Sequence, residues 1–305
     1  MPVFGRTLNV FQAAGFEGLK AVEWNKSMYA VGGYNGTIYS GATFRSPDGY
    51  VIEIPNPHNA ATSLSGRAHH GMVVHNNRIF VTGGYNAAGA LNDCWMYDGQ
   101  WTRVCENIGG ARYGHLMWSF DNRLYIAGGE SAATTYYDDV WASYDGVTWR
   151  KVLDNSPTLT RSFSAGCVWD NKMWFVGGYW GAALRDVWCS VNGFTWEQQL
   201  TANDLPTLCG HTVTVFDNKM VLIGGCTGWA QRAWTGVTSP SGLYYSENGS
   251  QWIRGADDLE FTRTAHAAFA FTDKQRLVVS CGSNGTVRYA DIWQSIGCEM
   301  FGRKS

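Results

Sequence analysis

The sequence has few charged residues, few prolines and almost no net charge, and each shortage excludes a class of protein. Charged side chains make up 16% of the 305 residues, and 23 basic against 25 acidic side chains leave a net charge of −2. So small a charge provides no global field that would attract nucleic acid or an anionic membrane. Only 7 prolines accompany 37 glycines, and 45% of the residues are hydrophobic. This composition excludes a disordered or collagen-like chain and predicts a large buried core.

Long apolar runs and targeting signals are also missing. No stretch of about 18 apolar residues occurs, so the sequence predicts no membrane helix. The first residues, MPVFGRTLNVFQAAGFEG, lack the basic segment and apolar run of a secretory signal. We therefore expect a cytoplasmic protein that binds neither a membrane nor nucleic acid. The sequence makes no prediction of the oligomeric state.

The cysteines form no recognisable metal site. All eight stand singly, without a Cys-x-x-Cys pair or a Cys/His cluster at zinc spacing. We expect no metal ion and no cofactor. Reduced thiols are the expectation, and some disulfides the alternative, for Cys94, Cys105, Cys167, Cys189, Cys209, Cys226, Cys281 and Cys298.

What the sequence does contain is a periodic apolar pattern rich in aromatic residues. The 15 Trp, 15 Tyr and 14 Phe favour pleated sheets over helices. Apolar runs closed by a diglycine end at Gly33, Gly84, Gly129, Gly178 and Gly225, and the variant LVVSCG ends at Gly282. Their spacings of 51, 45, 49, 47 and 57 residues indicate six repeats of about 50 residues.

Each repeat reads as four antiparallel strands. A strand with a polar Asn/Asp turn precedes the diglycine, as in GHLMWSFDN. A variable loop follows the diglycine, and then two strands joined by turns such as YDGQW, in which Asp-Gly is a strong hairpin signal. Four-stranded units repeated around an axis are the arrangement of a β-propeller.

These motifs resemble the kelch repeat over essentially the whole chain. The diglycine is accompanied by Asp-x-Trp at Asp93/Trp95, Asp139/Trp141, Asp186/Trp188 and Asp291/Trp293, and by a later Trp at Trp101, Trp149, Trp196 and Trp252. The resemblance implies one all-β, six-bladed propeller. We place the blades at about 15–62, 63–107, 108–156, 157–204, 205–259 and 260–301, with residues 1–14 added to the last.

The spacing also predicts how the ring closes. Phe4 lies 21 residues before Asn25, the same distance that separates an outer-strand Trp from the next inner turn in other repeats. Phe301 lies eight residues after Trp293 and occupies the same register. Because the N-terminal copy continues further, we expect it to supply the outer strand of the sixth blade. The C-terminal tail is expected to be displaced or paired beside it.

Arginine and histidine recur where the inner strands begin. Loops on one rim of a rigid scaffold often carry binding groups, and guanidinium groups hold carboxylate or phosphate through two hydrogen bonds. Arg67, Arg112, Arg161 and Arg263 are therefore candidate ligand-binding residues, and a purely structural role for them is the alternative. Three residues further on, hydrogen bonds between blades are the favoured interpretation for His70, His115, His211 and His266.

Aromatic residues follow several diglycines and suggest a binding rim. Rings could stack on a sugar or a peptide there. The candidates are Tyr34, Tyr85, Tyr179 and Trp180, together with Trp229, Arg232 and Trp234 in the longest loop. A packed lid is the alternative for that loop.

Three functions remain open. A module that recognises an acidic peptide is favoured, as the resemblance to peptide-capturing kelch adaptors implies. A glycan-binding surface or viral receptor-binding protein is the second, and an enzyme acting on a carbohydrate or small molecule is the third. Glu130 is the one rim carboxylate directly after a diglycine and so the weak catalytic candidate. The copper-radical oxidase motif of some kelch propellers has no match, and we lean against an enzyme.

Overall fold

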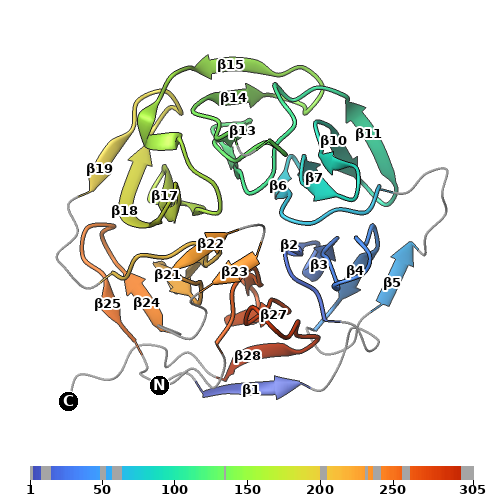
Figure 1. The fold of residues 1–305 in the computed structure, drawn as a ribbon. Coiled ribbons are helices and arrows are strands. Elements are labelled where there is room, and N and C mark those ends of the chain that lie inside the picture. Colours follow the sequence, from blue (N-terminus) through green and yellow to red (C-terminus); the bar gives the residue numbers. More distant parts are fainter. Residues whose placement is uncertain are drawn as a thin grey trace.

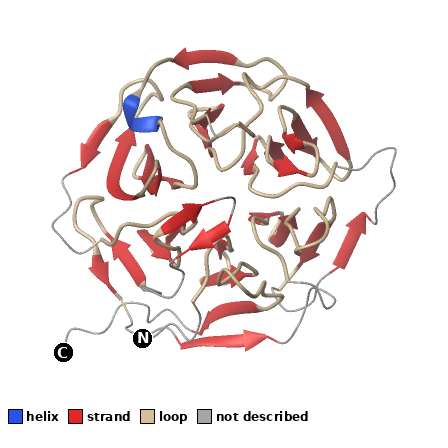
Figure 2. Cartoon of the chain, viewed as in Figure 1, coloured by secondary structure: helices blue, strands red, loops and turns tan. Residues whose placement is uncertain are grey.

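The chain folds into six four-stranded antiparallel sheets around one axis, as the repeats predicted (Figure 1). The computed structural model describes residues 3–7, 15–48, 53–56, 64–133, 135–199, 205–230, 233–235, 242–255 and 262–296. Figure 2 shows strands and loops throughout these ranges, apart from one 3-10 turn, η1 (Pro157–Leu159). The blade boundaries assigned above stay a prediction, because several fall outside the described residues.

Each sheet forms one blade, which we number along the chain. Blade 1 contains β2 (Lys20–Trp24), β3 (Ser27–Val31), β4 (Thr43–Ser46) and β5 (Glu53–Asn56). Blade 2 contains β6 (Gly71–His75), β7 (Arg78–Thr82), β10 (Cys94–Tyr97) and β11 (Trp101–Cys105). Blade 3 contains β12 (Leu116–Phe120), β13 (Arg123–Ala127), β14 (Val140–Ser143) and β15 (Arg150–Leu153).

The remaining blades follow the same plan. Blade 4 contains β16 (Ala165–Trp169), β17 (Lys172–Tyr179), β18 (Ala183–Ser190) and β19 (Glu197–Gln199). Blade 5 contains β20 (Thr212–Phe216), β21 (Lys219–Ile223), β24 (Leu243–Ser246) and β25 (Ile253–Arg254). Blade 6 contains β26 (Ala267–Phe271), β27 (Arg276–Ser280), β28 (Ile292–Ile296) and β1 (Val3–Thr7). Two small hairpins complete the list, β8 (Tyr85–Asn86) with β9 (Gly89–Ala90), and β22 (Gly228–Ala230) with β23 (Ala233–Thr235).

Four of the inner hairpins, those of blades 2 to 5, are closed by the Asn/Asp pairs that the sequence marked as turns. Asn76 and Asn77, for example, adopt φ of 45° and 56° between β6 and β7. Two residues with positive φ form a turn whose twist matches that of the flanking strands, and Asn and Asp tolerate this conformation. All six inner strands therefore run from one face of the propeller to the same opposite face. We call the face with the diglycines the loop face and the face with these turns the turn face.

Strand β1 closes the ring in the predicted way. It pairs antiparallel with β28, from Val3 opposite Ile296 to Thr7 opposite Ile292. The prediction that the N-terminal segment supplies the outer strand of blade 6 is confirmed. The continuation through Leu8, Val10 and Phe11, and the C-terminal copy at Phe301, lie outside the described residues.

The core consists of apolar layers between neighbouring blades. Six clusters of buried residues each combine side chains of two adjacent blades, and together they occupy all six interfaces. Trp118 of blade 3 lies in one such layer with Phe175 of blade 4, and both are fully buried. Burying one large apolar side chain contributes about 1.5–3 kcal/mol, so these layers hold the ring together.

Candidate functional site

The four predicted arginines lie inside the blades, where each binds an aspartate of its own blade. In blade 2, Arg67 donates from Nη1 to Asp93 Oδ1 at 2.7 Å and from Nη2 to Oδ2 at 3.0 Å. The same Nη1 also donates to the carbonyl of Gly83, at the diglycine. Asp93 in turn accepts a hydrogen bond from the indole of Trp95 at 2.7 Å. We call this arrangement the Arg–Asp–Trp clamp.

The clamp recurs in blades 3, 4 and 6. The arginine side chains are buried, and their Nη1-to-carboxylate distances are 2.5 to 2.8 Å, for the pairs Arg112/Asp139, Arg161/Asp186 and Arg263/Asp291. Blades 1 and 5 lack both partners, since Phe16 and Leu208 stand at the arginine position, and Ala42 and Gly242 stand at the aspartate position. Arginine and aspartate thus occur or are absent together. This co-occurrence favours the structural role, and ligand binding by these arginines stays an untested prediction.

The positive charge of the clamp arginine affects the pKa of the carboxyl group that it binds. Burial raises the pKa of Asp93, but the hydrogen bond and the positive charge of Arg67 outweigh that effect and lower it below its ordinary value. Asp93 is therefore ionised whenever the protein is folded near neutral pH.

Trp229 and Trp234 belong to a packed lid rather than to an exposed loop. They face each other across the β22–β23 hairpin, with ring centroids 4.4 Å apart, and are 8% and 6% exposed. Both rings pack on Phe163 at 4.7 and 4.8 Å, and both contact His69. We call these four residues the aromatic lid. The lid alternative left open by the sequence is therefore the one that the contacts favour, while Arg232 lies outside the described residues.

Glu130 is buried under this lid. Only 2% of the residue is exposed, and Oε1 accepts a hydrogen bond from the indole of Trp229 at 3.1 Å. Burial raises the pKa of the neighbouring Tyr136 to about 12, and the negative charge of Glu130 contributes to the increase. Glu130 therefore does not stand at an accessible rim, where a catalytic role was considered.

A ring of backbone hydrogen bonds lies beneath the lid. One residue of each blade donates its N–H to the carbonyl of the neighbouring blade's equivalent residue, with N-to-O distances of 2.7 to 2.9 Å, through Gly18, His69, Gly114, Phe163, Gly210 and Ala265. All six have φ between 51° and 69°. The circle of six bonds narrows the axis, and Trp234 covers a small cavity of about 30 Å³ at its level.

The aromatic residues predicted for the rim divide into two groups. Tyr34 and Tyr85 are half-buried members of a continuous aromatic row that leads through Tyr39 and Tyr113 to Phe163, with centroid distances of 4.5 to 6.0 Å. Tyr179 is also half-buried. Trp180 differs from all of them, because it is 58% exposed at the tip of the β17–β18 hairpin.

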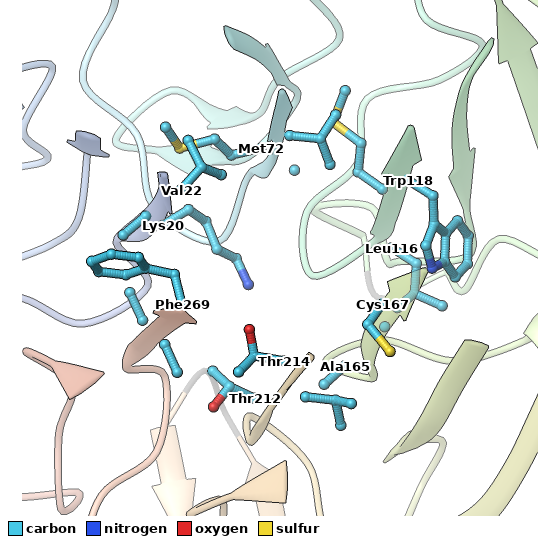
Figure 3. Close-up of a pocket in the computed structure, with 18 of the residues that line it drawn as sticks. Lys20, Val22, Met72, Leu116, Trp118, Ala165, Cys167, Thr212, Thr214 and Phe269 are labelled. Carbon is cyan, nitrogen blue, oxygen red and sulfur yellow. The ribbon is translucent and has the colours of Figure 1, made fainter. Parts of the chain in front are cut away.

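Below the ring, the axis widens into a cavity of about 400 Å³ that the inner strands of all six blades line. Figure 3 shows apolar walls with the hydroxyl group of Thr214 and the ammonium group of Lys20 directed inward. Sequence reasoning did not identify Lys20 as a site residue. The available signal was its position, since it is the one charged residue among the first residues of the six inner strands.

The four histidines lie between the blades at the end of this cavity that is next to the hydrogen-bonded ring. Nε2 of His115 is 2.9 Å from Oγ1 of Thr82 in blade 2, and Nε2 of His266 is 2.8 Å from Oγ1 of Thr212 in blade 5. These two make the interblade hydrogen bonds that the sequence favoured. Neither ring nitrogen of His70 or His211 has a partner.

The described part of the chain shows little sign of metal or disulfide chemistry. No three His, Cys, Asp or Glu side chains within it are grouped so as to hold a metal ion. The seven cysteines it contains are free thiols, and the Sγ atoms of Cys209 and Cys226 lie 3.6 Å apart. No helix among these residues has the length and apolarity needed to cross a membrane.

Comparison with known proteins identifies the repeat. The family model of the KLHDC2/KLHL20/DRC7 Kelch-repeats domain matches residues 18–225, more than half of the chain. Alpha-scruin of Limulus polyphemus is 26% identical over 170 residues, 52% of this chain and 18% of that protein. Kelch repeat and BTB domain-containing protein 1 of cowpox virus (strain Brighton Red) is 30% identical over 99 residues, 30% of this chain and 17% of that protein. The matches thus span less than a fifth of either relative.

Proposed function

The chain belongs to the kelch-repeat family, and from this premise we propose that it is a recognition module that binds a peptide segment of a partner protein across its loop face. Kelch propellers generally mediate protein–protein interactions. The observation that carries the proposal for this chain is the exposure of Trp180. Tryptophan is enriched among the residues that dominate binding energy at protein interfaces.

The position of Trp180 is fixed by its hairpin. Its N–H donates to the carbonyl of Ala182 at 3.0 Å, and Gly181 between them adopts φ of 70°. A hairpin backbone held in this way loses little conformational freedom on binding, which favours affinity. Because the aromatic lid covers the axis on this face, the partner lies across the surface and does not enter the channel.

The bound segment is acidic in this proposal. Arg185, in the same hairpin as Trp180, is exposed and makes no ion pair or hydrogen bond within the described ranges. Such a guanidinium group is available to a carboxylate of the partner. The four clamp arginines, in contrast, already hold aspartates.

Selection of displayed peptides on the purified protein tests this function. We expect the selected peptides to be rich in Asp and Glu, and Trp180→Ala to weaken their binding by about 2 kcal/mol, roughly thirtyfold. Arg185→Ala should weaken the binding of acidic peptides specifically. Phe194→Ala is the matched control, because Phe194 is 54% exposed in the turn between β18 and β19 at the opposite end of the same blade.

Equal binding of the selected peptides to the wild-type protein and the Trp180→Ala variant would overturn the proposal. A glycan array provides the competing result. Sugar binding that depends on Trp180, without peptide binding, would support the glycan-binding function instead.

A further inference from the structure

The axial cavity contains a basic side chain whose charge no described residue neutralises. Lys20 opens β2, and its Nζ makes no hydrogen bond or ion pair within the described part of the chain. Figure 3 shows Nζ directed toward the middle of the cavity. The one acidic residue that lines the cavity is Glu23, and its Oε2 accepts hydrogen bonds from the N–H and the hydroxyl of Thr272 at 3.0 and 2.8 Å. Lys20 is half-buried, and a charge that is partly removed from water without a counterion is costly.

Two buried histidines beside the cavity also lack partners. His70 is 0% exposed and His211 is 5% exposed, and neither ring nitrogen of either residue has a hydrogen bond. Thr82 provides a hydroxyl group for His115 at the interface of blades 2 and 3. At the equivalent strand positions beside His70 and His211 stand Val31 and Val176, which have no polar side-chain atom. Each neutral imidazole has one N–H donor. The ring nitrogens are buried beside the cavity, and the backbone of Val176 also acts on the ring of His211.

The shape of the cavity limits what could occupy it. Its loop end is narrowed by the hydrogen-bonded ring and covered by Trp234. From there it extends along the inner strands to Val168, which is 38% exposed toward the turn face. Lys20 and the histidines lie at the loop end of the cavity, next to the ring. Apolar side chains such as Leu116 and Phe269 line the walls. The cavity of about 400 Å³ thus combines a polar end with apolar sides.

We propose that this cavity binds a small organic anion, with its carboxylate or phosphate group against the ammonium group of Lys20. The anionic group accepts hydrogen bonds from His70 and His211, directly or through water. Its apolar part lies along the walls toward the turn face. The site goes beyond the recognition of a protein partner, because it is entered from the opposite face and uses none of the loop-face residues.

Calorimetric titration with benzoate, acetate and inorganic phosphate tests the proposal. We expect the wild-type protein to bind benzoate at one site, and more tightly than acetate because of the apolar walls. Lys20→Met should weaken binding about tenfold or more, since a hydrogen-bonded charge pair is lost. The control is Lys26→Met, which removes a charge of the same sign from the exposed turn of the same hairpin. Trp180→Ala should leave anion binding unchanged, which separates this test from that of the peptide site.

Failure of the wild-type protein to bind any of the three anions, or equal binding to the Lys20→Met variant, would overturn the proposal. If phosphate binds in a way that depends on Lys20 but benzoate does not bind, the anion site is supported. The proposal that an apolar part of the ligand lies along the walls is then contradicted. A second measurement needs no variant. Reductive methylation of the wild-type protein, followed by mass spectrometry, should show benzoate protecting Lys20 but not Lys26. Equal methylation of Lys20 with and without benzoate would contradict the site.

Discussion

Arg112 and Asp139, 27 residues apart along the chain, form a two-pronged ion pair inside blade 3. Nη1 donates to Oδ1 at 2.7 Å and Nη2 to Oδ2 at 3.3 Å, and the arginine is 0% exposed. The carboxylate also accepts a hydrogen bond from Trp141 at 2.8 Å. Because Arg112 also donates to the carbonyls of Gly109 and Gly128, it connects the loop before β12 with the diglycine. The pair therefore stabilises the start of the blade.

Removal of the arginine should strongly destabilise the protein. Arg112→Ala removes the two-pronged partner of the buried Asp139 and leaves only Lys151, whose Nζ lies 4.0 Å from Oδ2, as a nearby positive charge. We expect a loss of about 3–5 kcal/mol in the free energy of unfolding. Arg103→Ala is the control, since the Arg103–Glu106 pair has side chains 50% and 78% exposed and should contribute little. Urea unfolding followed by circular dichroism measures both. Similar unfolding midpoints for the two variants would contradict a structural role for the clamp.

The ring of backbone hydrogen bonds leaves no room for a side chain at Gly210. A Cβ atom there would clash most closely with Oγ1 of Thr264 and would also lie 2.8 Å from the ring of Trp234, at φ of 65°. Gly181 has a similar φ of 70° but nothing within 4 Å of an added Cβ. Gly181→Ala should cost about 1–2 kcal/mol, the penalty of the left-handed conformation. Gly210→Ala should cost about 1–3 kcal/mol more because of the close contact.

Thermal unfolding of the two glycine variants measures this difference directly. Equal losses of stability would mean that Thr264 and Trp234 both move aside without cost, and the lid would not be packed as described.

The buried histidines should make the protein sensitive to mild acid. Burial is the main cause that lowers the pKa values of His70, His115, His211 and His266. It lowers the pKa of His211 to about 3. Between the unfolded value of about 6.5 and these lower values, the unfolded chain binds more protons than the folded one. The free energy of unfolding should thus be constant above about pH 6.5 and fall below it, by up to about 1.4 kcal/mol per pH unit for each histidine.

Urea unfolding between pH 8 and pH 5 measures this dependence. The variant His211→Gln should show a smaller slope than the wild-type protein, because one titrating group is removed. A stability that stays flat down to pH 5 would show that the histidines become protonated without unfolding.

Periodicity explains how much of the fold could be predicted from the sequence. The diglycines and the Asn/Asp turns occur in register, so the number of blades and the closure by Phe4 followed from spacing alone. The arginines were harder to interpret. Their position indicated a rim, whereas the parallel loss of aspartate at Ala42 and Gly242 was the signal of a structural pair, and it was visible in the sequence.

The departures from the repeat could not be predicted in the same way. Trp229 and Glu130 are 99 residues apart, in loops of blades 5 and 3, and no spacing rule relates them. Their contact across the axis follows from packing of the aromatic lid on Phe163. Lys20 was not singled out, because its position marks it as a charged residue of an inner strand but does not fix the direction of its flexible side chain.

The pairing of β1 with β28 has a consequence for synthesis of the protein. In the sequence β1 precedes the other described strands of the propeller and β28 follows them, so β1 is synthesised long before the strand with which it pairs. Until β26, β27 and β28 have been made, the layers on both sides of blade 6 stay open. The circular molecule can therefore be completed only after translation of β28, and interrupted synthesis yields an arc with exposed apolar ends.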